Sequence, residues 1–353
     1  MRIRSSDPNS FILLGKSLPC PSHAKPTCLD AFMPHISYQT TYKIAHATIY
    51  SLSITYDTTN FFTSFDFFNE KDPTNGFVEY VGFETAVSEG LAGDRNGAIY
   101  MGVDTTTVSP ASGRKSVRVT SQTSFTHGLF IADIIHMPGS ICGVWPAMWL
   151  FGPNWPVSGE IDIIEGVNTQ VHNTITLHTG SGCYITNEGT LESTTLLESN
   201  CNAGYAHTGC SQSTANYQNY GNSFNANGGG VYAMEWTSDH ISIWFFARNQ
   251  IPDNIKTEFL DPSGWGLPTA RFTGGSGCNI DTYFMNNNLV FDTTFCGDWA
   301  GSAETWNTNL ECSALSSNCN DYVAANPAAF TEAYWLINSI KIFDQSTSSY
   351  NDK

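Results

Sequence analysis

The chain has 353 residues, with 15 Lys and Arg against 32 Asp and Glu, and its formal net charge is −17. A protein of this charge repels nucleic acid and anionic membrane surfaces, so both are excluded as partners. No apolar run approaches the ~20 residues of a transmembrane helix. Only 13% of the residues are charged and another 13% are aromatic, a composition that suits a neutral ligand.

The beginning of the chain differs from the rest. Arg2 and Arg4 supply positive charge, but the apolar run 11–14 is much shorter than the core of about 7–15 residues in a secretory signal. Either a mis-predicted start or an unrelated extension would explain this segment. We therefore expect an atypical N-terminal extension over residues 1–46, a main domain over 47–345 and a short tail over 346–353.

Short strands separated by Gly, Asn, Asp and Pro turns dominate the main domain. Strands are predicted over residues 78–85, 98–103, 116–122, 129–135, 147–151, 160–165, 173–179, 230–236, 240–246 and 332–343. Both faces of 240–246 are largely apolar, which is typical of a strand covered on both sides. Helical periodicity is confined to 214–220 and 326–330. The pattern favours an all-β fold of two stacked antiparallel sheets.

Residues 186–230 are rich in Ser, Thr, Asn and Gly and predict a long loop region. This region either shapes one end of a binding site or is a surface excursion tied by disulfides.

The segment 159–166, Gly-Glu-Ile-Asp-Ile-Ile-Glu-Gly, is the most informative part of the chain. Its β-branched residues favour a buried strand, where carboxylates rarely occur without a function. On a helix, Glu160 and Glu165 would lie about 140° apart and could not converge on one bond. On a strand, Glu160 and Asp162 share one face, and a one-residue bulge at Ile163-Ile164 would bring Glu165 to the same face.

Two Glu residues at this spacing indicate glycosidic chemistry. Four strand steps separate two Cα atoms by roughly 13 Å, and side chains that lean together would bring the carboxyl groups to about 5–6 Å. A retaining glycosidase requires a separation of about 5–5.5 Å. The alternatives are a solvated acidic strand and a calcium site, although calcium prefers oxygen ligands on a flexible loop.

This motif and its surroundings resemble glycoside hydrolase family 16, in particular the laminarinase-type branch, whose signature has one extra residue before the second Glu. Residues 144–150 (Val-Trp-Pro-Ala-Met-Trp-Leu), 152–156 (Gly-Pro-Asn-Trp-Pro) and 177–179 (Leu-His-Thr) also fit that family. The resemblance covers about residues 47 to 345, and fungal endo-β-1,3(4)-glucanases are the most similar type. It implies a concanavalin-like jelly-roll sandwich with a concave substrate cleft.

The resemblance also assigns roles to the three carboxyl groups. It makes Glu160 the nucleophile and Glu165 the acid/base, whose pKa burial and neighbouring charges would raise. Asp162 would hydrogen-bond Glu160 and tune the pair, or would simply hold the strand. No cofactor and no metal ion are expected.

Several tryptophans are candidates for stacking on sugar rings. Trp145 and Trp149 are four residues apart and so share a strand face. From the residues alone they could equally be core side chains, and the family resemblance favours the substrate. Trp155 and Trp299 are candidates for the same task.

Three polar residues complete the predicted site. The family places a His at the position of His178, near the acid/base, although a lone His is usually structural. Arg118 alternates with two valines and either donates hydrogen bonds to a sugar or pairs with an acidic residue. Asn96 is a candidate for binding a sugar hydroxyl.

Eight of the ten cysteines lie in the family-like region, and an even number predicts disulfides and an oxidising compartment. Cys201–Cys210 and Cys312–Cys319 are plausible local pairs, although spacing alone does not fix the connectivity. The alternative is zinc bound through His207, Cys210 and Cys201, but the close Cys pairs typical of zinc sites are absent.

Together these observations predict a secreted, extracellular, monomeric retaining endo-glucanase that acts on β-1,3 or mixed β-1,3/1,4-glucan, with the polysaccharide as its partner. The alternatives are a transglycosylase on the same site, a hydrolase of another β-1,3-linked glycan, and a non-catalytic glucan-binding protein.

Overall fold

The structure is a computed structural model that describes residues 49–204 and 208–345. The described residues belong to one compact unit. The predicted extension over 1–46 and the tail over 346–353 lie outside the described residues, and so does His207 of the zinc alternative.

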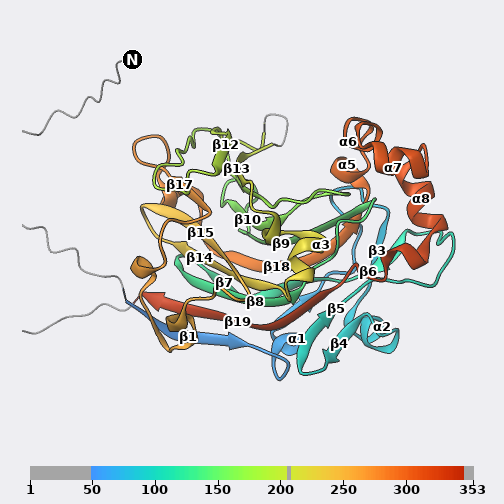
Figure 1. Cartoon of the computed structure of the whole chain (residues 1–353), viewed down its shortest axis with the longest axis horizontal. Coiled ribbons are helices and arrows are strands. Elements are labelled where there is room, and N and C mark those ends of the chain that lie inside the picture. Colours follow the sequence, from blue (N-terminus) through green and yellow to red (C-terminus); the bar gives the residue numbers. More distant parts are fainter. Residues whose placement is uncertain (1–48, 205–207, 346–353) are drawn as a thin grey trace, which may run out of the picture. The chain divides into compact units, whose positions relative to one another are not determined.

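Two antiparallel sheets, one of nine strands and one of eight, form the body of the described chain (Figure 1). The nine-stranded sheet contains β1 (Tyr50–Tyr56), β4 (Ala92–Arg95), β5 (Ala98–Met101), β8 (Gly128–His136), β14 (Gly230–Trp236), β15 (His240–Ala247), β16 (Phe259–Leu260), β17 (Ala270–Thr273) and β19 (Trp335–Gln345). Its order is β16-β1-β19-β8-β14-β15-β17, and the β4–β5 hairpin joins it through β5 and β19.

The eight-stranded sheet carries the acidic motif. It contains β2 (Phe65–Phe67), β7 (Arg118–Phe125), β9 (Val144–Phe151), β10 (Glu160–Glu165), β11 (Thr174–His178), β12 (Thr194–Glu198), β13 (Cys210–Thr214) and β18 (Asn287–Phe295). Its order is β12-β13-β11-β10-β9-β18-β7-β2, so β10 lies near the middle. A separate parallel pair consists of β3 (Val78–Tyr80) and β6 (Arg114–Ser116).

The helices are short. They are α1 (Phe61–Ser64), α2 (Phe83–Ser88), α3 (Gly221–Ala226), α4 (Ile280–Tyr283), α5 (Gly297–Ala300), α6 (Ala303–Thr308), α7 (Leu310–Leu315) and α8 (Cys319–Ala325), with 3-10 turns η1 (Tyr217–Asn219), η2 (Asp253–Lys256), η3 (Pro262–Gly264) and η4 (Pro327–Phe330). In Figure 1, α5 to α8 lie together at one end of the sandwich. Within residues 49–204 and 208–345, none of the helices has the length and apolar character needed to cross a membrane.

The inner faces of the two sheets share one apolar core. Residues of β15 illustrate the pattern, because Ile241 and Ile243 enter this core while Trp244 and Phe246 pack on the other side of their sheet with Trp265. Burial of such side chains, at about 25 cal/mol per Å², is the main force that holds the sheets together. The predicted all-β antiparallel sandwich, and the predicted strand covered on both faces, are thus confirmed.

Three predictions about individual segments were wrong. Residues 83–85 begin α2 instead of extending a strand, and the region 186–230 contains β12, β13 and α3. The helices α5 to α8 were not predicted at all, because segments of four to seven residues are too short to show a helical period. The sequence did contain one indication of three of these helices, namely the N-cap residues Ser302, Asn309 and Asn318.

All eight cysteines of the main domain form disulfides, which pair Cys142 with Cys312, Cys183 with Cys278, Cys201 with Cys210, and Cys296 with Cys319. The Cys201–Cys210 prediction is confirmed, and its disulfide removes those two thiols as zinc ligands. The predicted Cys312–Cys319 pair is wrong. Both side chains lie in an apolar cluster that also contains Cys142 and Cys296, and each forms its disulfide with one of these two residues.

We predict unequal contributions of two disulfides to stability. The Cys142–Cys312 bond spans 170 residues and Cys201–Cys210 spans nine, so the first restricts the unfolded chain far more. Replacing Cys142 and Cys312 together by Ala should lower the free energy of unfolding by about 2 kcal/mol more than the same change at Cys201 and Cys210. Urea unfolding of the two double variants measures the difference, and equal losses would contradict it.

Candidate active site

A β-bulge in β10 places three carboxyl groups on one face of the eight-stranded sheet, which is called here the carboxylate face. Glu160 lies opposite Phe151 of β9, and Asp162 lies opposite Trp149. The register then shifts by one residue between Asp162 and Ile164, so that Glu165 faces Ala147. Phe151, Trp149 and Ala147 alternate along one face of β9, which means that Glu160, Asp162 and Glu165 share that face. The bulge predicted at Ile163-Ile164 is confirmed.

The isoleucines of the motif anchor β10 in the core. Ile161, Ile163 and Ile164 are all buried in the core between the sheets. Each buried side chain of this size contributes about 1.5–3 kcal/mol relative to exposure. The strand thus has its apolar residues in the core while the carboxyl groups point away from it.

Asn173, just before β11, holds the bulge in place. Its side-chain amide donates to the carbonyl oxygen of Ile163 at 2.7 Å and accepts the backbone N–H of Glu165 at 2.9 Å. These are backbone groups that a bulge removes from the regular ladder, and leaving them unpaired would be costly. Asn173 is itself 1% exposed. Sequence reasoning missed it, because an Asn at the start of a strand has no distinctive local pattern.

The three carboxyl groups lie in different surroundings. Asp162 is buried, whereas Glu160 and Glu165 are half-buried. Burial, and next the charge of Glu160, raise the pKa of Asp162 well above its usual range. Burial and the charge of Asp162 likewise raise the pKa of Glu165, while the Trp145 hydrogen bond and His178 oppose the rise. Both groups are therefore biased toward the protonated form.

His178 of β11 lies beside the motif, opposite Glu160 in the sheet register. Its Nε2 atom is 3.3 Å from Oδ2 of Asp162. One ligand atom from each of Glu160, Asp162 and His178 lies within 4.8 Å of the others, so this trio could approach a cation. Two carboxyl groups and one imidazole at this distance can also share protons without any cation. The expectation that the site holds no metal stays a prediction.

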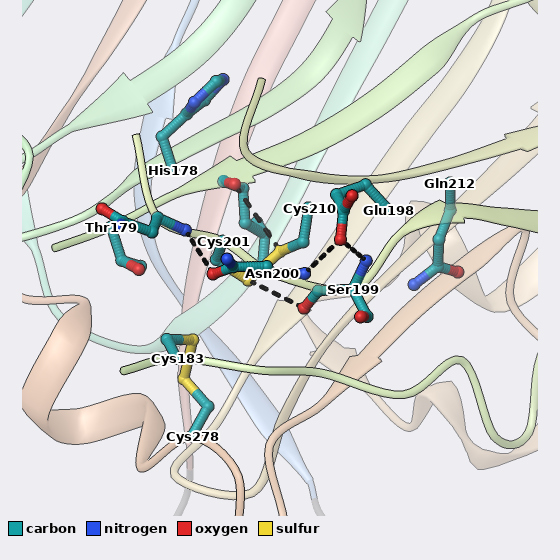
Figure 2. The surroundings of a disulfide bond; sticks show 12 residues. His178, Thr179, Cys183, Glu198, Ser199, Asn200, Cys201, Cys210, Gln212 and Cys278 are labelled. Carbon is teal, nitrogen blue, oxygen red and sulfur yellow. Dashed lines mark hydrogen bonds between the residues drawn. A yellow bond between two sulfur atoms is a disulfide. The ribbon is translucent and has the colours of Figure 1, made fainter. Parts of the chain in front are cut away.

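Two disulfides fasten the chain next to His178 (Figure 2). The backbone N–H of Thr179 donates to the carbonyl of Cys201 at 2.7 Å, and that of Cys201 donates to Cys183 at 3.0 Å. Because Cys201 bonds Cys210 and Cys183 bonds Cys278, the end of β11 is held against the segment around residue 200. The region predicted as a loop thus has a fixed position at this edge of the site.

Tryptophans line the carboxylate face on both sides of β10. The indole Nε1 of Trp145 donates to Oε1 of Glu165 at 2.9 Å. Trp299 of α5 stands edge-on to Trp145, with ring centroids 5.5 Å apart. Trp155 is 47% exposed, and its Nε1 donates to a carboxylate oxygen of Glu160, a contact that the sequence did not predict. Three indoles thus surround the two Glu side chains.

Arg118 of β7 also faces this side of the sheet. Its guanidinium carbon lies 4.7 Å from the ring centroid of Phe68 and 5.0 Å from that of Trp149. Arg118 is 7% exposed, yet its Nε atom has no hydrogen-bond partner among the described residues. A buried donor without a protein partner has capacity for a ligand.

Asp292 of β18 is a site residue that sequence reasoning missed. It pairs in register with both Ala147 and Arg118, and accepts hydrogen bonds from the Tyr80 hydroxyl at 3.0 Å and Trp149 Nε1 at 3.3 Å. Burial raises the pKa of Asp292 to about 6, although the charge of Arg118 opposes the rise. A single Asp in a strand without a repeated motif gave no signal in the sequence.

Asn96 is not among the residues that the structure brings to the carboxylate face. It lies in the turn of the β4–β5 hairpin, which belongs to the nine-stranded sheet, and has a φ of 57°. The conformation is one that Asn adopts readily in tight turns. The fold therefore accounts for this residue without a ligand.

Comparison with known proteins agrees with the fold and the motif. Residues 65–343 match the XgeA-like, catalytic GH16 domain. The chain is 43% identical over 304 residues to the endo-1,3(4)-beta-glucanase of Arthroderma benhamiae, covering 85% of this chain and 66% of that protein. It spans about half the length of further curated fungal relatives.

Solved structures show the same likeness. An elongating GH family 16 beta-1,3-glucosyltransferase is 45% identical with a TM-score of 0.78, and Laminarinase 16A from Phanerochaete chrysosporium is 38% identical with a TM-score of 0.79. Each comparison covers 84% of this chain and all of the other. The fold is that of a GH16 sandwich, and the chain belongs to the GH16 family.

We predict that Asp292 makes stability depend on pH. Because its pKa in the folded protein is about 6, against about 3.9 when unfolded, its stabilising contribution is present below pH 4 and is lost as the pH rises through 6. The free energy of unfolding of wild type, minus that of Asp292→Asn, should fall by about 2–3 kcal/mol from pH 4 to pH 7. Urea unfolding at several pH values measures this slope. A constant difference would contradict the raised pKa.

Proposed function

We propose that the chain is a retaining endo-glucanase that hydrolyses β-1,3-glucan or mixed β-1,3/1,4-glucan. The observation that carries the proposal is the bulged strand β10, which brings Glu160 and Glu165 to one face. Retaining glycosidases need two carboxyl groups flanking the scissile bond. The relatives named as endo-1,3(4)-beta-glucanases and the laminarinase neighbour support this substrate class.

The proposal assigns a role to each carboxyl group. Glu160 would attack the anomeric carbon and form a glycosyl ester. Glu165, biased toward its protonated form by burial, would donate a proton to the leaving oxygen and later take one from water. Asp162, whose pKa burial and the charge of Glu160 raise, would hydrogen-bond Glu160 and hold that carboxylate in place.

Substrate binding would use the residues around these groups. Trp145, Trp149 and Trp299 would offer apolar ring faces to sugar C–H groups. Arg118, whose Nε atom has no hydrogen-bond partner among the described residues, would offer a donor to hydroxyls. His178 would orient Asp162 from the next strand. The site needs no cofactor for this chemistry.

A second activity has a specific observation in its favour. The structural neighbour with 45% identity is an elongating GH family 16 beta-1,3-glucosyltransferase. On the same residues, a sugar hydroxyl in place of water would attack the glycosyl–Glu160 ester, and Glu165 would take its proton. Chromatography of the products, which are either shorter chains only or also longer chains, separates the two activities.

The setting of the enzyme is also a proposal. Four disulfides require an oxidising compartment, and the fungal relatives are polysaccharide-degrading enzymes by name, so we place the protein outside the cell. We further propose that residues 47–345 are the catalytic domain and that it acts as a monomer.

Replacing the nucleophile should separate binding from chemistry. We predict that Glu160→Ala lowers kcat on laminarin at least about 10⁴-fold, because no glycosyl ester can form, while glucan binding is kept. Reducing-end release measures turnover, and affinity electrophoresis in laminarin measures binding. Glu311→Ala, an exposed carboxylate on α7, is the control and should behave as wild type. Wild-type rates in Glu160→Ala would exclude the mechanism.

The pH profile should respond to Trp145. Its indole donates to Glu165 and favours the ionised carboxylate, so Trp145→Phe should raise the pKa of Glu165. Since Glu165 must start protonated, the alkaline limb of kcat/KM should move up by about one pH unit.

The control for this profile is Trp265→Phe, which removes an indole that donates to Asn254 on the far side of the nine-stranded sheet. It should leave the limb in place. A Trp145→Phe limb that stays in place or moves to lower pH would contradict the role of Glu165 as the acid.

A further inference from the structure

A hollow of about 560 Å³ lies beside the β4–β5 hairpin of the nine-stranded sheet. Residues 89–91, which follow α2, line one side of it together with Arg95 and Tyr100 of the hairpin, and residues 103–107 and Thr331 line the rest. The volume is within the range of about 300–1,000 Å³ that is typical of small-molecule sites. In Figure 1, β4, β5 and α2 lie together at the lower right, away from β10.

This hollow and the carboxylate face belong to opposite outer surfaces of the sandwich. Ile99 of β5 and its register partner Ile337 of β19 both lie in the core between the sheets. Because side chains alternate along a strand, the neighbouring register pair, Tyr100 and Leu336, points to the outer surface of the nine-stranded sheet. The carboxyl groups of β10 point away from the same core on the other sheet. The hollow is therefore not a part of the proposed catalytic site.

An arginine stacked on a tyrosine forms one wall of the hollow. The guanidinium carbon of Arg95 lies 3.3 Å from the ring centroid of Tyr100, whose ring is 5.6 Å from that of Tyr334. Arg95 is exposed, and both tyrosines are half-buried. Arg95 takes part in none of the ion pairs within residues 49–204 and 208–345. The stacked guanidinium thus presents N–H donors to a ligand beside an aromatic plane.

The other groups in the lining favour a neutral ligand. The carboxylate of Glu89 is paired with Lys115, and that of Asp104 with Arg114. A cation would have to compete with these pairs, and an anion bound by Arg95 would be repelled by both carboxylates. The remaining polar side chains are the hydroxyls of the threonines at 105, 106, 107 and 331. Hydroxyls, a guanidinium and an aromatic ring suit a neutral ligand that is rich in hydroxyl groups, as a sugar is.

Hydrogen bonds hold the threonine-rich wall in place before any ligand binds. The carboxylate of Asp104 accepts the backbone N–H of Thr106 at 2.9 Å and that of Thr107 at 3.1 Å. Arg114, which is 0% exposed, donates from one guanidinium nitrogen to the backbone carbonyls of Asp104 at 2.9 Å and Thr107 at 3.3 Å. Binding to a wall that is already ordered loses less free energy to ordering.

We propose that this hollow is a second glucan-binding site, which holds a polysaccharide chain on the surface opposite to the catalytic face. The identity of that chain as a β-1,3-glucan rests on the proposed function. Because the two sites face opposite directions, a short oligosaccharide cannot occupy both at once. Insoluble glucan offers many chains side by side, so that one protein molecule can bind two of them and is held more tightly than by either site alone.

Adsorption to curdlan, an insoluble β-1,3-glucan, tests this site. The measurement uses Glu160→Ala as the parent protein, so that the polymer is not cleaved. Adding Arg95→Ala, which removes the guanidinium, or Thr107→Phe, which fills the hollow, should raise the curdlan concentration needed for half-maximal adsorption about tenfold. With Glu160 intact, each change should also lower the ratio of the turnover of curdlan to that of laminarihexaose.

Val108→Phe is the matched control. It adds the same ring one residue from Thr107, at a position that is 65% exposed and outside the lining, and should keep the adsorption of the parent. If Arg95→Ala and Thr107→Phe also adsorb like the parent, the hollow binds no glucan and this inference alone is wrong. A wild-type protein that neither adsorbs to curdlan nor cleaves any glucan would overturn the proposed function and this inference together.

Discussion

The site depends on one extra residue in β10. Without the bulge, strict alternation would turn Glu165 into the apolar core, where a carboxyl group has no partner. With it, Ile163 and Ile164 both stay buried and Glu165 joins Glu160 on the outer face. The bulge leaves backbone groups without ladder partners, and the amide of Asn173 pairs with two of them. The fold thus positions two carboxyl groups by packing and by one buried side chain.

Burial raises the pKa of two carboxyl groups of the motif. Asp162 and Glu165 experience desolvation and a neighbouring negative charge, both of which favour the protonated form. The indole of Trp145 opposes this at Glu165 and so limits how far its pKa rises. Double displacement requires a proton donor beside a nucleophile, and the proposed mechanism assigns these two roles to similar side chains in different surroundings. The indole of Trp145 also stands edge-on to Trp299 of α5.

Local patterns predicted much of the fold and the central motif. Alternation and β-branched residues identified β10, β14 and β15, and the spacing of the carboxylates even required the bulge. Features set by distant parts of the chain were missed. Cys142 and Cys312 are 170 residues apart, so no local rule pairs them. Asp292 and Asn173 act through neighbours on other strands. Asp292 belongs to the site only because β18 pairs with β9, and this pairing has no signal in the local sequence.

The measurement that tests this account most directly is trapping of the glycosyl ester. A 2-deoxy-2-fluoro laminaribiosyl donor with a good leaving group forms the ester quickly and hydrolyses it slowly, so mass spectrometry of a digest can locate the sugar. The account predicts a single labelled peptide with the sugar on Glu160, and loss of label in Glu160→Ala. A label on Glu165 or Asp162, or turnover of the donor without any covalent adduct, would contradict the assignment of the two carboxyl groups.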